Sequence, residues 1–187
     1  MQVLACDISG IPFDWISSND AATYYASQKV AWDIGDIARV YRGGTNHDGD
    51  TSLISIRPVI AIASNARKVK VLRHVIPLGD GNRLLFTRDR STCAYCGDIF
   101  PHSELSRDHI LPKSKNGEDT WSNCVTACRR CNQAKADKFI HDFKPLLYVP
   151  YEPCRYEHYL LSGRNVIADQ HDYLAAKLPR HSRVLWF

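Results

Sequence analysis

The sequence predicts an α+β protein in which a small module, built around four cysteines, lies between a sheet-forming region and a helical tail. Short β-branched runs separated by Gly, Pro and Asn turns fill residues 1–90, and they indicate a small antiparallel sheet. Two Cys-x-x-Cys pairs mark residues 91–140. Residues 141–187 begin with a proline-rich connector and continue as helix-forming runs. We therefore expect three regions with these boundaries.

Composition and charge narrow the class of protein. The chain has 187 residues, of which 44% are hydrophobic and 24% charged, as is ordinary for a globular fold. A net charge of +4 is too small for the whole surface to attract nucleic acid, so such binding would depend on local basic clusters. No stretch approaches the roughly 18 apolar residues of a membrane span, and no signal-peptide pattern is visible, so no membrane partner is expected.

Residues 1–90 show strand and turn signals, with one helix begun by the polar triplet Ser18-Asn19-Asp20. The run 52–62 is rich in β-branched residues but contains Pro58, which predicts an edge strand or a bulge. Glycines from 43 to 49 predict the tip of a hairpin. We expect a helix at 21–30 and strands at 3–6, 30–34, 40–41, 69–72 and 83–86.

The four cysteines of the middle region are the strongest signal in the chain. Cys93 and Cys96 form one pair, and Cys128 and Cys131 form the other. Two short knuckles with two thiolates each match tetrahedral zinc, and a closed four-cysteine site leaves no open position for water. We expect a structural zinc ion here. The alternatives are two unrelated knuckles or a redox-active Cys-x-x-Cys pair.

The remaining cysteines indicate the redox environment in which the protein folds. Cys6, Cys124 and Cys154 are left after four residues are assigned to zinc, and three cysteines make no disulfide framework. This usage fits a reducing environment, and we expect a cytoplasmic protein.

The segment between the two cysteine pairs reads as strand, loop and strand. Residues 106–112 form a short strand stopped by proline, and residues 113–120 are polar with an Asn116-Gly117 turn signal. Residues 123–126 read as the returning strand. Good helix formers without Gly or Pro fill residues 129–138, so a helix follows.

This pattern resembles the HNH endonuclease family, whose core is the ββα-metal fold. The letters of the family name fall on His109, Asn123 and Asn132, which makes the chain similar to an H-N-N variant. The residues that carry the resemblance are Cys93-x-x-Cys96, Asp108-His109-Ile110-x-Pro112, Asn123 and Cys128-x-x-Cys131-Asn132-x-x-Lys135.

The resemblance implies a role for each of these polar residues. His109 would be the general base that activates water, because imidazole titrates near neutral pH. Asp108 and Asn132 would hold a divalent ion, Mg²⁺ or Mn²⁺, and Asn123 would tie the loop by backbone hydrogen bonds. Adjacent strand residues point to opposite faces, so Asp108 and His109 serve one phosphate only if the strand end twists or the two groups approach from different sides.

Basic residues near the module are the candidates for nucleic-acid contact, and a solvated surface is the alternative for each of them. One patch precedes the module at Arg83, Arg88 and Arg90, and another comprises Arg67, Lys68, Lys70 and Arg73. We expect the nucleic-acid contacts at Arg88, Arg90, Arg107, Arg129, Arg130, Lys135 and Lys138.

The tail is expected to contain helices at 156–162 and 166–178, separated by Gly163 and stopped by Pro179. Such a tail would brace the nuclease module or form the surface of a homodimer.

Together these patterns predict a metal-dependent endonuclease that hydrolyses DNA by water attack at phosphorus, with RNA less favoured. One constellation per chain should cut one strand per binding event, and a double-strand break would need a dimer or two nicks. The alternative is a non-catalytic zinc module that binds nucleic acid.

Overall fold

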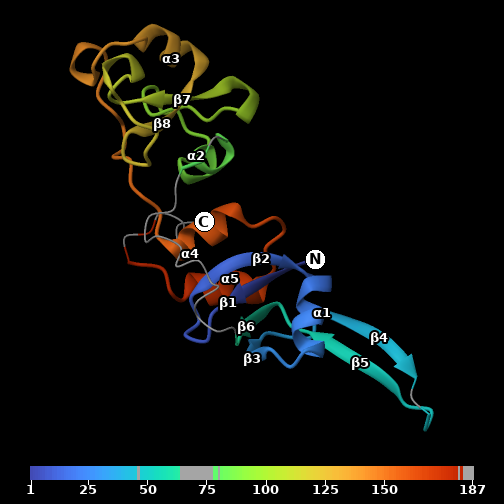
Figure 1. Cartoon of the computed structure of the whole chain (residues 1–187). Helices are drawn as coiled ribbons and strands as arrows, with labels where there is room; N and C mark the ends of the chain where they lie inside the picture. Colours follow the sequence, from blue (N-terminus) through green and yellow to red (C-terminus); the bar gives the residue numbers. More distant parts are fainter. Residues whose placement is uncertain (46, 64–77, 80, 181, 183–187) are drawn as a thin grey trace. The chain divides into compact units, whose positions relative to one another are not determined.

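The computed structural model divides into two compact units (Figure 1). The first comprises Met1–His74 and Arg155–Pro179, and the second comprises Val75–Cys154 and Arg180–Phe187. These limits differ from the three regions expected from composition, because one element before residue 90 packs into the second unit and the tail helices pack into the first. No helix among the described residues is long and apolar enough to cross a bilayer. The residues described are 1–45, 47–63, 78–79, 81–180 and 182.

The first unit is built on a four-stranded sheet with strand order β2-β1-β6-β3. Strand β1 pairs antiparallel with β2 and parallel with β6, and β6 pairs antiparallel with β3. The sheet is therefore mixed and not purely antiparallel as expected. The parallel pair arises because β1 and β6 are far apart in the chain, so no tight hairpin constrains their direction. The strand bounds are Gln2–Cys6 for β1, Pro12–Ser17 for β2, Val30–Ile34 for β3 and Val59–Ile62 for β6.

Helices cover both faces of this sheet, because alternate residues of β1 are buried on opposite faces. Val3 and Ala5 are buried in a cluster with Ala21 of α1, whereas Leu4 and Cys6 are buried in a cluster with residues of α4 and α5. Successive strand residues point to opposite faces, so a strand that is apolar throughout must be covered on both. The helices are α1 at Ser18–Ala26, α4 at Arg155–Ser162 and α5 at Ala168–Ala175.

Helix α1 starts where the sequence predicts. The Ser17 side chain accepts a hydrogen bond from the Asp20 backbone N–H, and the Asp20 carboxylate accepts one from the Ser17 N–H, which completes a capping box. The helix ends at Ala26, earlier than the expected Val30. Gln28 has a positive φ of 54°, which turns the chain so that Val30 can begin β3.

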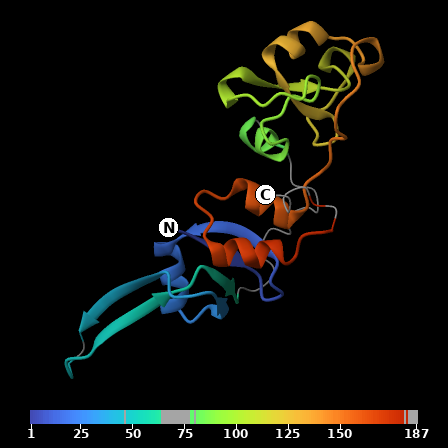
Figure 2. The same ribbon diagram turned by 180° about the vertical axis from the view of Figure 1, so that it is seen from behind.

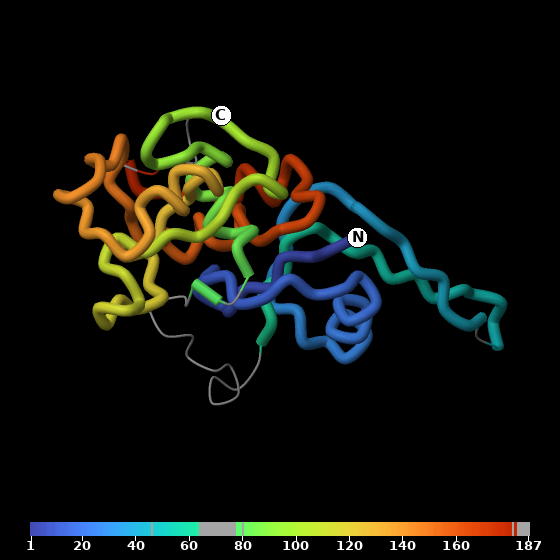
Figure 3. The backbone as a smooth tube through the Cα atoms, turned by 90° about the horizontal axis from the view of Figure 1, so that it is seen from above, coloured from blue at the N-terminus to red at the C-terminus, as the bar shows by residue number. Residues whose placement is uncertain are grey.

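The β-branched run 52–62 forms two strands in different sheets and not one edge strand. Strand β5 (Thr51–Ile56) pairs with β4 (Arg39–Thr45) in a hairpin that extends away from the rest of the unit (Figure 3). Strand β6 lies inside the four-stranded sheet between β1 and β3. Pro58 sits just before β6, where its missing N–H removes no ladder bond, and its carbonyl accepts from Leu4 N at 2.9 Å.

The tail helices pack against the sheet of the first unit. The Gln170 side-chain amide of α5 donates to the carbonyls of Gln2 at 2.8 Å and Pro58 at 3.0 Å. The Trp15 indole donates to the carbonyl of Tyr159 in α4 at 3.2 Å. The sequence indicated these two helices correctly, but it did not indicate which sheet they cover.

The second unit contains the expected ββα arrangement (Figure 2). Strands β7 (Leu105–His109) and β8 (Cys124–Cys128) pair antiparallel, and α3 (Arg129–Lys135) follows β8 directly. Residues 83–86, expected as a strand, instead begin helix α2 (Arg83–Arg88). A short apolar run does not distinguish helix from strand by periodicity, and here the helix buries Leu85 and Phe86 in one cluster with β7.

Candidate active site

The four cysteines meet at one point of the second unit. The Sγ atoms of Cys93, Cys96, Cys128 and Cys131 all lie within 4.8 Å of one another. In a tetrahedron with metal–sulfur distances of about 2.3 Å the sulfur atoms lie about 3.8 Å apart, so this cluster fits zinc. Burial raises the pKa of the Cys93 thiol, but backbone N–H groups, that of Cys128 foremost, outweigh it and leave the pKa below its ordinary value. Burial raises the pKa of the Cys96 thiol to about 11 and that of the Cys131 thiol to about 12, so a metal ion bound at the cluster would have to displace their protons.

The cysteine cluster fixes the beginning of α3 beside the first knuckle. Cys128 is the last residue of β8 and the N-cap of α3, and its sulfur accepts a hydrogen bond from Cys131 N at 3.4 Å. Cys93, Cys128 and Cys131 are buried in one apolar cluster with Tyr95 and Ala127. A metal ion held here would join the knuckle, the sheet and the helix, which is a structural task.

His109 is the last residue of β7 and pairs with Cys124 across the two-stranded sheet. Its side chain is 15% exposed, and its Nε2 atom lies 2.8 Å from Oδ1 of Asp119. The imidazole is therefore accessible but held in one orientation.

Asp108 is more enclosed than its neighbour, as alternation along a strand predicts. Its Oδ1 atom accepts from the Lys135 ammonium at 3.0 Å, and its Oδ2 atom accepts from the Tyr95 hydroxyl. The Lys135 ammonium also donates to the carbonyl of His109 at 2.7 Å, and the Lys135 side chain is completely buried. Asp108 thus carries a charge that a buried lysine already balances.

A single depression nevertheless joins three of the predicted residues. It has a volume of about 240 Å³, and Asp108, His109 and Asn132 all contribute to its lining. The Asn132 amide nitrogen donates to Ser106 Oγ at 2.9 Å and to the Arg107 carbonyl at 3.1 Å. These two bonds fix the amide so that its oxygen is the atom left to bind a ligand.

Asn123 ties the loop between the strands, as was expected of it. Its side-chain nitrogen donates to the carbonyls of Leu111 at 3.2 Å and Glu118 at 2.9 Å, and its side-chain oxygen accepts from Leu111 N at 2.8 Å. The Asn123 carbonyl accepts from Ile110 N at 2.8 Å. Asn123 therefore shapes the backbone next to His109 and does not itself enter the depression.

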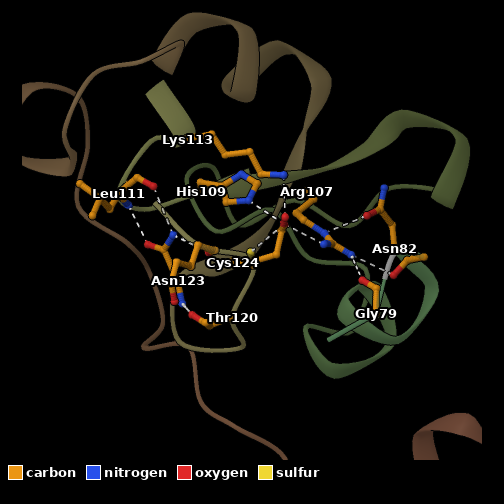
Figure 4. A network of polar contacts seen from close by, with 12 residues as sticks. Gly79, Asn82, Arg107, His109, Leu111, Lys113, Thr120, Asn123 and Cys124 are labelled. Atoms are coloured by element: carbon orange, nitrogen blue, oxygen red, sulfur yellow. Dashed lines mark hydrogen bonds and ion pairs between the residues drawn. The ribbon is translucent and has the colours of Figure 1, made fainter. Parts of the chain in front are cut away.

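Asp119 is the site residue that sequence reasoning missed. Besides His109, its carboxylate contacts Arg107 Nη1 at 2.9 Å and Lys113 Nζ at 2.6 Å (Figure 4). Lys113, Arg107 and His109 together hold the pKa of Asp119 well below its ordinary range. The signal in the sequence was slight. It was one carboxylate shortly after the Asn116-Gly117 turn, in the loop that joins β7 to its partner strand β8.

A second group of metal-ligand atoms also occurs here, because His109, Asp119 and Cys124 place one such atom each within 4.8 Å of the others. Burial raises the pKa of the Cys124 thiol to about 11, and two cations already contact Asp119. A metal ion would have to compete with Arg107 and Lys113 for Asp119, so we interpret this group as an ion-pair network.

The predicted nucleic-acid contacts separate into buried and exposed residues. The Arg88 guanidinium is fully buried and bonds to Asp89 and to the carbonyls of Trp121 and Cys124, so it holds α2 against β8. Lys135 is buried beside Asp108. These two positions correct the expectation of contact with nucleic acid, because neither side chain reaches the surface. The Arg107 guanidinium forms an ion pair with Asp119. The exposed candidates are Arg90, Arg129, Arg130 and Lys138. The patch at Arg67, Lys68, Lys70 and Arg73 and the strand expected at 69–72 lie outside the described residues.

A ββα unit with a four-cysteine cluster and an accessible histidine at the end of its first strand defines a nuclease-type module. Residues 93–145 match the family model described as HNH endonuclease. A stretch of 51 residues is 41% identical to the CRISPR-associated endonuclease Cas9 of Corynebacterium diphtheriae. This stretch covers 27% of the chain and 5% of that relative, so the likeness concerns a small part of each protein.

Proposed function

We propose that the module is a metal-dependent endonuclease that hydrolyses phosphodiester bonds of DNA with water as the nucleophile. The observation that carries this proposal is the shared depression lined by Asp108, His109 and Asn132, in a module that matches the HNH endonuclease family. The depression is open to solvent and offers a basic nitrogen, a carboxylate and an amide oxygen to a bound phosphate ester.

His109 acts as the general base in this proposal. The ring must take a proton from water while remaining in place, and its contact with Asp119 supports both requirements. General base catalysis contributes about 10²- to 10⁴-fold to a rate when the base lies within hydrogen-bond reach of the water.

Asp108 and Asn132 are the residues that would hold a divalent ion. A carboxylate and an amide oxygen suit Mg²⁺ or Mn²⁺, which complete their coordination with water and phosphate oxygens. When bound, such an ion neutralises the scissile phosphate and stabilises the leaving 3′ oxygen. The donor set fits, although Lys135 shares the charge of Asp108, and we expect an affinity lower than that of an unpaired carboxylate.

Zinc at the four cysteines completes the proposal as a structural ion. Four thiolates leave no coordination position for water or substrate, so its contribution is to folding and not to the reaction. Thiolate ligands must remain reduced, and we accordingly propose a reducing compartment such as the cytoplasm.

Exposed cations around the beginning of α3 would hold the phosphate backbone. Arg129 lines a depression beside Asn132 and another beside the cysteine cluster, which Arg130 also lines. Arg90 and Lys138 are exposed in the same unit. Contacts of this kind position nucleic acid without reading its sequence. One site per chain predicts one nick per binding event, and a homodimer or a second event would be needed to cut both strands.

A non-catalytic zinc module that binds nucleic acid is the second candidate. One observation favours it: the buried ammonium of Lys135 already balances the charge of Asp108, which weakens Asp108 as a metal ligand. Binding that survives EDTA, without cutting under any divalent ion, would support this candidate.

Cleavage of supercoiled plasmid by the purified chain tests the proposal. Mg²⁺, Mn²⁺ and Ni²⁺ are titrated, with EDTA and the His109→Ala protein as negative controls. His141→Ala is the matched control, because this imidazole belongs to the same unit and its side chain is 76% exposed. We expect metal-dependent nicking by the wild-type and His141→Ala proteins, and none by His109→Ala. Cleavage by folded His109→Ala at the wild-type rate would remove His109 as the base. Absence of cleavage by zinc-loaded wild-type protein with every ion would favour the binding module.

A further inference from the structure

The orientation of the His109 ring is set by a single carboxylate. Nε2 of His109 lies 2.8 Å from Oδ1 of Asp119. An ionised carboxylate can only accept hydrogen bonds, so a neutral imidazole at this distance must carry its proton on Nε2. We propose that Asp119 is a positioning residue that fixes this tautomer and leaves Nδ1 of His109 as the nitrogen that takes a proton from water. The inference rests on the proposed role of His109 as the base.

Two cations keep Asp119 in the acceptor state and in place. Arg107 Nη1 donates to the same oxygen that His109 contacts, at 2.9 Å, and Lys113 Nζ donates to the other oxygen at 2.6 Å. Each carboxylate oxygen of Asp119 therefore accepts from a cationic side chain, Arg107 on one side and Lys113 on the other. A carboxylate held in this way cannot rotate away from the ring without breaking two ion pairs.

Arg107 is itself anchored, which makes the network rigid. Its Nη2 atom donates to the carbonyls of Gly79 at 2.9 Å and Gly81 at 3.0 Å, and its Nε atom donates to Asn82 Oδ1 at 3.1 Å. Figure 4 shows Arg107 reaching between this segment and the centre of the network, with His109 and Lys113 beside it. The guanidinium thus uses its remaining donors on the segment before α2 and cannot follow Asp119 if the loop moves.

The loop that carries Asp119 is fixed at its own backbone. Asn123 bonds to the backbone of Leu111 and Glu118 on either side of the turn. At Gly117 a Cβ atom would collide with the Leu111 carbonyl, so the chain passes there only without a side chain. These contacts return residue 119 to the end of β7. Gly117 and Asn123 therefore help to place the Asp119 carboxylate beside His109.

The tautomer can be read without measuring activity. Protein labelled with ¹⁵N in histidine rings is examined by long-range ¹H–¹⁵N correlation at a pH where the His109 ring is neutral. The His109 signals among the eight histidines are identified by their loss in His109→Ala. We expect a protonated Nε2 and an unprotonated Nδ1. A protonated Nδ1 on His109 in the wild-type protein would overturn the inference, whatever the nuclease activity.

Cleavage kinetics test whether the orientation matters to the reaction. Asp119→Ala should lower kcat by at least about tenfold at saturating divalent ion, with KM for DNA nearly unchanged, because the base loses its orientation and the phosphate contacts remain. Asp119→Glu restores a carboxylate and should recover part of kcat. The matched control is Glu118→Ala, which removes the adjacent exposed carboxylate and should cleave at the wild-type rate.

Loss of fold is separated from loss of orientation by a second variant and a folding check. Asp119→Asn is nearly isosteric, and its zinc content and hydrogen exchange show whether the module is folded. A folded Asp119→Ala protein with wild-type kcat would refute the inference, because alanine has no acceptor for the His109 ring. If His109→Ala retained full cleavage, the proposed function of His109 would fail, while the tautomer measurement would still decide the role of Asp119.

Discussion

Replacement of Lys135 by methionine should strongly destabilise the second unit. The side chain is completely buried, and its ammonium donates to Asp108 Oδ1 at 3.0 Å and to the His109 carbonyl at 2.7 Å. Methionine retains most of the apolar contacts but leaves a buried carboxylate with only the Tyr95 hydroxyl and a carbonyl without its donor. Breaking one partner of a buried ion pair costs about 3–5 kcal/mol, which is a large fraction of the free energy of unfolding of a typical domain.

Hydrogen exchange measured by mass spectrometry isolates this effect, because the peptides of β7, β8 and α3 report on the second unit alone. A loss of about 3 kcal/mol or more should accelerate exchange by about 100-fold or more for amides that open with the unit. Lys138→Met removes an exposed lysine and should change the free energy of opening by about 0.5 kcal/mol at most. Adding Asp108→Asn to Lys135→Met should recover part of the loss. Exchange in Lys135→Met equal to that in Lys138→Met would refute the reasoning.

Three other outcomes are expected. Arg88→Lys should destabilise the second unit by roughly 2–4 kcal/mol, because an ammonium cannot replace a guanidinium that bonds to several buried acceptors, whereas the exposed Arg90→Lys should have little effect; equal melting temperatures would contradict this. Chelation of zinc should make the thiol of Cys128 reactive to alkylation while Cys6, whose pKa burial raises to about 12, stays protected in the first unit; equal labelling would show that the units unfold together. The folded-state pKa of Asp119 is depressed, so its contribution is complete above pH of about 4 and is lost on further acidification. The stability difference between wild type and Asp119→Asn should therefore shrink below pH 4, and a difference that grew would exclude the ion pairs as its source.

The module was predictable because its signals are local. Paired cysteines, a proline after a short strand and a run of helix formers each act over a few residues, and together they located β7, β8 and α3. The family match over residues 93–145 agrees with the resemblance carried by the same positions. Strands β1, β3 and β4 of the first unit were indicated for the same reason, whereas β2 was not predicted.

What could not be predicted depends on contacts between distant residues. Lys135 and Arg88 are basic residues, which are typical of a nucleic-acid-binding surface. Only the fold shows that each is buried against acceptors far away in the sequence. The parallel pairing of β1 with β6 and the packing of α4 and α5 on that sheet are likewise non-local. Asp119 belongs to no motif, and its proximity to His109 follows from the path of a loop.

The two units are nested in the chain, since Val75–Cys154 interrupts the residues that form the first unit. If the inserted unit lost its fold while the first unit kept its sheet and helices, the first unit would have to close a longer flexible loop. The entropy of closing a loop grows only with the logarithm of its length, by about 0.6 kcal/mol for each doubling. The loop-closure term alone would therefore cost the first unit little if the inserted unit were unfolded or enlarged.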